Sequence, residues 1–203
     1  MISVSRIGLV LTLCCLWLGG QVPPAIAQTN VQQQSQQALA AKGEGSGKLS
    51  IPDAVLLDQD GRRVRFYTDL IKGKVVIINF VFTSCTIVCP PLGANFARIQ
   101  TALGERLGKD VHLISITRDP EMDTPAKLRT WGAKFGARPG WTLVTGEKAQ
   151  IDEVLLALIG DIARKGEHSA IVLVGSDARG VWKHDYGLAA PARLLKLADD
   201  LNR

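Results

Sequence analysis

The sequence predicts an α/β fold with a central mixed sheet, flanking helices and an N-terminal β-hairpin. Residues 75–82 form an apolar run on both faces, as expected for a central parallel strand. Residues 90–107 place apolar side chains at helical spacing. Two pairs of strand-like segments, one early and one late in the chain, each flank a turn. A parallel sheet covered by helices, with antiparallel additions, accounts for all three observations.

Each further element has its own local signal. Asp60-Gly61 separates strands at 54–58 and 62–66 and is a hairpin turn. Asp123-Thr124-Pro125 opens a helix with a capping residue and an early proline. The other predicted elements are strands at 111–117 and 141–144, a helix at 149–159, hairpin strands at 170–174 and 180–183, and a closing helix at 191–201. This order of elements is that of a thioredoxin-like fold.

The first 48 residues predict an export signal followed by a linker. Arg6 precedes an apolar stretch at 7–18, and Ala25-Ile26-Ala27 fits a cleavage site, so residues 1–27 are a signal peptide or a retained anchor. Residues 28–48 are rich in Gln, Ala, Gly and Ser and predict a flexible linker. Residues 49–203 then form one domain. The expected location is the periplasm, either soluble or anchored to the inner membrane.

Charge and cysteine content limit the function. The chain has 24 Lys and Arg against 19 Asp and Glu, scattered without a basic run, which gives no reason to expect nucleic-acid binding. Cys14 and Cys15 fall within the signal, so Cys85 and Cys89 are the thiols expected in the mature protein. In an oxidising compartment this pair is a redox couple, a metal site or a plain structural bridge.

Several polar residues are predicted to meet at one edge of the sheet. Sites in open α/β sheets form beyond the carboxyl ends of the parallel strands. Cys85 follows the strand at 75–82, and Asp119 follows the strand at 111–117. An antiparallel strand begins at that same edge, so His168, just before the strand from Ala170, can converge on the cysteines. Asp119 is either a turn residue or a group beside the site.

The other two histidines are weaker candidates. His112 begins a parallel strand and therefore lies at the opposite edge. His184 ends a strand that returns toward the correct edge, but hairpin pairing is expected to set it about opposite Val172, near the middle of the sheet.

The spacing of the thiols suits a soft metal. If Cys85 opens the helix, Cys89 lies one turn later on the same face. A helix N-terminus favours thiolates, and thiolates with imidazole suit copper. Two thiolates and one histidine make a plausible three-coordinate copper site, whereas structural zinc would require a fourth ligand.

The chain from about Leu49 onward resembles the Sco/SenC family of copper-handling proteins. The resemblance lies in three motifs, which are Phe82-Thr83-Ser84-Cys85-Thr86-Ile87-Val88-Cys89-Pro90, the segment Asp119-Pro120-Glu121-Met122-Asp123-Thr124-Pro125, and Glu167-His168-Ser169. It implies that Cys85, Cys89 and His168 bind copper and that Asp119 lies near the site. The chain departs from the family in lacking an acidic residue between the cysteines and an aspartate just before His168.

Two functions follow from this resemblance and the thiol pair. The first is an exported chaperone that holds one Cu(I) or Cu(II) and delivers it to an acceptor, which the resemblance implies is a cytochrome c oxidase subunit. It needs a thiol reductant that keeps the cysteines reduced. The second is a metal-independent thiol-disulfide oxidoreductase that uses the Cys85/Cys89 pair. The chain is therefore expected to be a metallochaperone rather than an enzyme, or an oxidoreductase if it is an enzyme.

Overall fold

The computed structural model describes residues 49–160 and 170–203 as one α/β domain. Its strands are β1 (Val55–Asp58), β2 (Arg63–Arg65), β3 (Val75–Val81), β4 (Val111–Thr117), β5 (Trp141–Thr145), β6 (Ile171–Ser176) and β7 (Val181–Tyr186). Its helices are a π-helix η1 (Phe66–Ile71), α2 (Cys89–Leu103), a 3-10 turn η2 (Gly104–Arg106), α3 (Pro125–Lys134), α4 (Lys148–Ile159) and α5 (Pro191–Asn202).

The strands form one mixed sheet in the order β2-β1-β5-β4-β3-β6-β7. Strand β3 is central and parallel to β4, which is in turn parallel to β5. The other pairings are antiparallel, including β3 with β6, where Asn79 faces Val172. The carboxyl ends of β3 and β4 and the beginning of β6 therefore share one edge of the sheet. The predicted mixed sheet with an N-terminal hairpin is confirmed.

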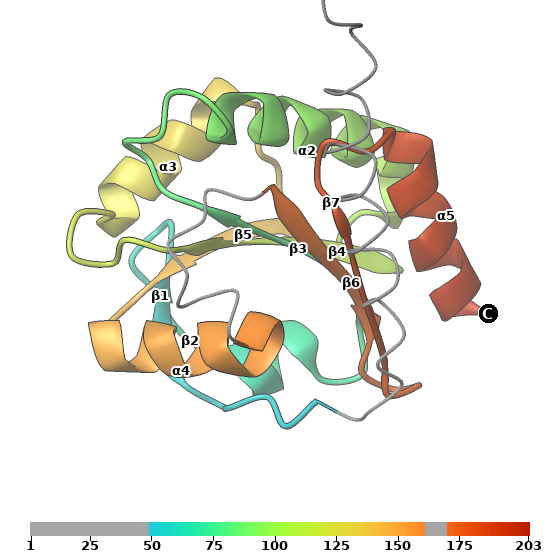
Figure 1. Ribbon diagram of the computed structural model, residues 1–203, viewed down its shortest axis with the longest axis horizontal. Coiled ribbons are helices and arrows are strands. Elements are labelled where there is room, and N and C mark those ends of the chain that lie inside the picture. The colour runs from blue at the N-terminus through green and yellow to red at the C-terminus, as the bar shows by residue number, and fades with distance from the viewer. Residues whose placement is uncertain (1–48, 161–169) are drawn as a thin grey trace, which may run out of the picture.

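Helices cover both faces of the sheet, as Figure 1 shows, with α2, α3 and α5 on one side and α4 with η1 on the other. Alternating side chains of β3 supply both cores. Ile77 and Val81 pack with Phe96 and Ile99 of α2, while Ile78 belongs to the opposite cluster. Every residue of β3 is buried, which confirms the strand predicted from its continuous apolar run.

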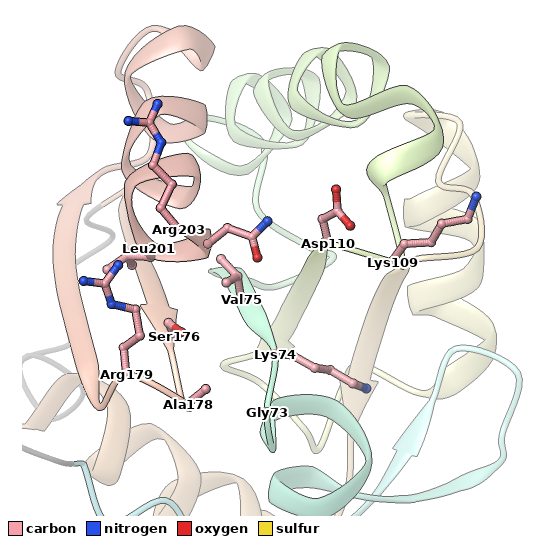
Figure 2. Close-up of a pocket in the computed structure, with 11 residues that line it drawn as sticks. Gly73, Lys74, Val75, Lys109, Asp110, Ser176, Ala178, Arg179, Leu201 and Arg203 are labelled. Carbon is pink, nitrogen blue, oxygen red and sulfur yellow. The ribbon is translucent and has the colours of Figure 1, made fainter.

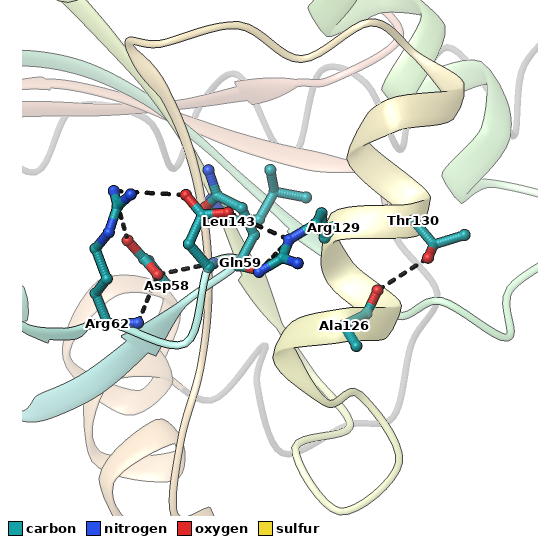
Figure 3. A network of polar contacts seen from close by, with 8 residues as sticks. Asp58, Gln59, Arg62, Ala126, Arg129, Thr130 and Leu143 are labelled. Carbon is teal, nitrogen blue, oxygen red and sulfur yellow. Dashed lines mark hydrogen bonds and ion pairs between the residues drawn. The ribbon is translucent and has the colours of Figure 1, made fainter.

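Polar contacts connect the turn of the N-terminal hairpin to β5 and to α3 (Figure 3). Gln59 in the turn accepts a hydrogen bond from the backbone N–H of Leu143 at 2.9 Å through its side chain. Its backbone carbonyl accepts from the guanidinium of Arg129 at 3.1 Å, and the same guanidinium pairs with Asp60 at 3.2 Å. The turn signal at Asp60-Gly61 therefore marks a point where the hairpin contacts the rest of the domain.

Two local predictions are wrong in detail. The helix expected over 90–107 ends at Leu103, because Gly104 adopts a positive φ of 54° and the chain continues as a 3-10 turn. In the second hairpin, both strands are longer than expected, and His184 faces Leu173 rather than Val172. The register differs by one residue because the turn occupies residues 177–180.

In the part of the chain that the structure describes, no helix combines the length and the apolar character needed to span a membrane.

Candidate metal and thiol site

The cysteine pair lies where β3 ends and α2 begins. The helix does not begin at Cys85, as one interpretation of the spacing assumed, but at Cys89, which is followed by two prolines suited to a first turn. Cys85 lies in the loop before it, and its Sγ accepts the backbone N–H of Cys89 at 3.3 Å. The Cys85 thiol thus faces the start of α2, and the Cys89 thiol belongs to its first turn.

The pKa values of the two thiols are shifted in opposite directions. Burial would raise the pKa of Cys85, but hydrogen bonds from the Cys89 thiol and from the N–H groups of Cys89, Ile87 and Val88 outweigh it, and the pKa lies below the ordinary value. Burial, with a smaller contribution from the hydrogen bond to Cys85, raises the pKa of Cys89 to about 12. Cys85 is partly exposed and Cys89 is buried, and both are free thiols. Cys85 is therefore the more acidic and the more accessible thiol of the pair.

Asp123 fixes the loop that carries Cys85, a role that the sequence argument did not assign to it. Its carboxylate is 1% exposed and accepts the backbone N–H of Thr83 at 3.1 Å and the Thr83 hydroxyl at 2.5 Å. It also accepts the hydroxyl of Thr117 at 2.7 Å, at the end of β4. The capping role falls instead to Thr124, whose hydroxyl accepts the N–H of Lys127. The signal that the sequence offered was the position of this Asp in Asp-Thr-Pro, shortly after the predicted strand at 111–117.

Asp119 lies at the predicted edge, in the turn after β4. Its backbone carbonyl accepts the N–H groups of Met122 and Asp123, and its own N–H donates to the Thr117 hydroxyl at 3.0 Å. The side chain is half-buried. These contacts match the turn interpretation, and the described residues offer its carboxylate neither a hydrogen bond nor an ion pair.

Arg118, beside Asp119, was not singled out by the sequence argument. It continues the ladder of β4, because its N–H donates to the carbonyl of Val81 at 2.8 Å. Burial lowers the pKa of its guanidinium, and attraction to Cys89 opposes that shift. A basic group therefore lies close enough to the buried thiol to interact with its charge.

The structure describes two of the three histidines. His168 falls outside the described residues, and Ala170, two residues later, is buried at the start of β6. The ring Nε2 of His184 lies 3.0 Å from the carbonyl of Leu158 in α4, on the face of the sheet opposite α2. His112 pairs with Val76 at the amino end of β3, at the opposite edge from the cysteines.

The opposite edge also contains a basic cavity of about 450 Å³ (Figure 2). Lys74, Lys109, Arg179 and Arg203 line it, but their side chains do not point toward one another. Lys74 donates to the backbone carbonyl of Asp69, and Arg179 donates to that of Asp200. The cavity is therefore separate from the thiol pair and has no convergent set of charges.

Among residues 49–160 and 170–203, no three His, Cys, Asp or Glu side chains gather closely enough to hold a metal ion. The cysteine pair thus brings two sulfur atoms together at this edge. The fold and this site together define a thioredoxin-like α/β protein with an asymmetric pair of thiols at the carboxyl ends of its parallel strands.

Comparisons with known proteins identify the family. The family model described as SCO1/SenC matches residues 46–187. The SCO1 protein homolog of Bacillus subtilis is 33% identical over 132 residues, which cover 60% of this chain and 66% of that protein. The chain therefore belongs to the SCO1/SenC family, and its match spans just under two thirds of that relative.

Solved structures share the fold. Bradyrhizobium japonicum ScoI, solved with copper bound, is 24% identical, with a TM-score of 0.60 over 75% of this chain and 99% of that chain. BsSco, described as having a disulfide switch and as a member of the Sco family of cytochrome c oxidase assembly proteins, is 24% identical, with a TM-score of 0.60 over 73% and 90%. These likenesses confirm the thioredoxin-like architecture.

Proposed function

We propose that this protein is an exported copper chaperone that holds one copper ion through Cys85, Cys89 and His168 and delivers it to an acceptor protein. The observation that carries the proposal is the contact between the two free cysteines. The Cys89 N–H donates to the Cys85 Sγ at 3.3 Å, and the two thiols are within hydrogen-bonding reach of each other. One soft metal ion can therefore contact both sulfurs.

The donor chemistry fits copper better than other metals. Thiolates select Cu(I), and imidazole accepts either oxidation state. Zinc in a structural site takes four protein ligands, and the described residues supply two sulfurs. Copper would displace the proton of Cys89, whose pKa of about 12 keeps it protonated in the metal-free protein.

His168 is the proposed third ligand. The supporting observation is its chain neighbour Ala170, which lies at the start of β6, beside the carboxyl end of β3. Two residues of chain span at most roughly 7 Å. His184 is the matched alternative, but its ring nitrogen already contacts the Leu158 carbonyl.

The proposed destination of the copper is based on what relatives of the chain are described as doing. BsSco belongs to the cytochrome c oxidase assembly proteins, and ScoI was solved with copper bound. We accordingly propose an oxidase subunit as the acceptor and a thiol reductant that keeps Cys85 and Cys89 reduced. Residues 1–27 are proposed as the export signal or membrane anchor, residues 28–48 as a linker and residues 49–203 as the functional domain.

An anaerobic titration of the reduced protein with Cu(I), against a chromophoric Cu(I) chelator, tests the proposal. One equivalent should be retained by the wild type, and Cys85→Ser, Cys89→Ser and His168→Ala should each weaken retention. A lost copper ligand changes affinity by about 10-fold or more. His184→Ala is the matched control, because it removes an imidazole that contacts α4 rather than the thiols.

Two results would reject this assignment. Retention of less than one equivalent by the reduced wild type would exclude a copper-carrying role. Equal retention by His168→Ala and His184→Ala would remove His168 from the ligand set.

The unequal acidity of the thiols also favours a second candidate, thiol-disulfide exchange. The Cys85 thiolate would attack a partner disulfide, forming a mixed disulfide and releasing one partner thiolate. Cys89, losing its proton, would then attack the Cys85 sulfur and release the second partner thiol. The pair becomes oxidised as the partner is reduced, so no metal is needed. Reduction of a model disulfide by metal-free protein, unchanged in His168→Ala, would favour this candidate.

A further inference from the structure

A groove lies directly beside the thiol loop, between that loop and α3. Its volume is about 320 Å³, and its lining residues are Thr83, Ala126, Lys127, Thr130, Trp131 and Lys134. Thr83 comes from the loop that carries Cys85, two residues before that thiol. The remaining lining residues occupy one face of α3, at spacings of three and four. The groove therefore follows the helix axis away from the cysteine pair.

The groove has charge of one sign only. Lys127 and Lys134 are exposed and line it together, and no Asp or Glu does. Within residues 49–160 and 170–203, neither lysine forms an ion pair. Arg129, on another side of the same helix, is by contrast paired with Asp60. Two unpaired ammonium groups beside an apolar floor formed by Ala126 and Trp131 suit an anionic ligand with some apolar surface.

The distance between the two lysines limits which ligands can pair with both of them. They are seven residues apart on the helix, which corresponds to about 10 Å along its axis at 1.5 Å per residue. A peptide in the extended polyproline II conformation advances about 3.1 Å per residue with three residues per turn, so carboxylates three residues apart lie on one face about 9 Å from each other. The groove thus matches an extended acidic segment rather than a single ion.

The loop beside the groove carries an exposed apolar anchor. Ile87, between the two cysteines, is 82% exposed, which makes it the most exposed large apolar side chain of the described residues. Met122, which follows β4 at the same edge, is 54% exposed. The loops that carry them are joined through the hydrogen bonds of Asp123 to Thr83 and Thr117. Both side chains are therefore available to contact an apolar surface of a partner.

We propose that this groove, lined by Lys127 and Lys134, docks an extended acidic segment of the protein partner that exchanges copper or electrons with Cys85. The inference rests on the proposed function, because copper transfer would bring a ligand atom of the partner to the ion held at Cys85, and thiol exchange would bring a partner sulfur to the Cys85 sulfur. A partner that reaches Cys85 then covers Thr83 and the adjacent groove. The carboxylates of that partner pair with the two lysines, and its apolar side chains contact Ile87.

Fluorescence anisotropy with two labelled peptides tests the docking without copper. Both peptides are about ten residues long and proline-rich, so that they are extended as polyproline II, and their charges are spaced three residues apart on one face. One carries glutamates and the other carries lysines at the same positions. The wild type should bind the glutamate peptide about 10-fold more tightly, and added salt should reduce the difference. The double variant Lys127→Glu/Lys134→Glu should abolish or reverse this preference.

Lys72→Glu/Lys183→Glu is the matched control, because it changes the net charge equally at two exposed lysines outside the groove. It should retain most of the preference. Equal binding of both peptides by the wild type would overturn the proposal. Equal losses in the two double variants would also overturn it, since a general charge effect would then explain the binding. Binding to phosphatidylglycerol vesicles that depends on the two groove lysines, without peptide preference, would assign the groove to a membrane surface instead.

The copper titration separates this inference from the function on which it rests. A protein that retains no copper but keeps the lysine-dependent peptide preference would reject the chaperone and leave the groove intact. A protein that binds copper but shows no peptide preference would reject the groove alone.

Discussion

Replacing Asp123 with alanine should separate the loop that carries Cys85 from the end of β4. The buried carboxylate accepts three donors, which are the Thr83 N–H, the Thr83 hydroxyl and the Thr117 hydroxyl. A hydrogen bond to a charged group contributes about 1.5–3 kcal/mol, and the two hydroxyls can rotate toward other acceptors once the carboxylate is gone. We therefore expect Asp123→Ala to lower the free energy of unfolding by about 3–5 kcal/mol.

Urea unfolding of the reduced, metal-free protein measures this loss. Asp123→Asn is the graded variant, since it retains one oxygen and the shape of the side chain, and it should lose about 1–2 kcal/mol. Asp119→Ala is the matched control at the same edge, because the described residues give its carboxylate no hydrogen bond or ion pair. It should stay within about 0.5 kcal/mol of the wild type. If Asp123→Ala and Asp119→Ala lost equal stability, the bridging role of Asp123 would be refuted.

Two further predictions concern the reactivity of the thiols and the packing of α2 against Gly187. Iodoacetamide should modify Cys85 well before Cys89 at neutral pH, as peptide mass mapping would show, because only the Cys85 pKa is lowered and that of Cys89 is about 12. Equal modification would contradict the assigned asymmetry. Gly187→Ala should destabilise the domain by about 1–3 kcal/mol in thermal unfolding, because the added Cβ would lie 2.5 Å from the Leu92 Cδ1 atom. An unfolding midpoint equal to that of the wild type would show that the Leu92 side chain moves aside without cost, and would contradict this expectation.

The sequence predicted the elements whose local pattern and tertiary environment agree. Strand β3 is the clearest case, because seven consecutive apolar or buried positions suit only a strand covered on both faces. The meeting of Cys85 and Asp119 at one edge followed from strand direction alone, and the pairing of β3 with β4 confirms that direction. Features that depend on local sequence pattern and on strand direction could therefore be predicted from the sequence.

Other features depend on tertiary contacts that no local pattern contains. The start of α2 at Cys89 depends on Cys85 accepting the Cys89 N–H, a contact that involves the loop rather than the helix. The role of Asp123 depends on two threonines, one of them 40 residues away in the chain. The position of the hairpin beside β5 depends on pairing at only Leu57 and Asp58, supported by Gln59 and Arg129.

The asymmetry of the thiols determines how the two candidate functions differ in their dependence on pH. With its pKa raised by burial to about 12, the Cys89 thiol stays protonated at neutral pH. Copper bound through both sulfurs must displace that proton, so its affinity rises with pH across the whole neutral range. Thiol exchange begins with Cys85 alone, whose thiolate the start of α2 favours, and its first step levels off once Cys85 is ionised. The pH dependence of copper affinity therefore reports on Cys89, the buried thiol, whereas that of the first exchange step reports on Cys85.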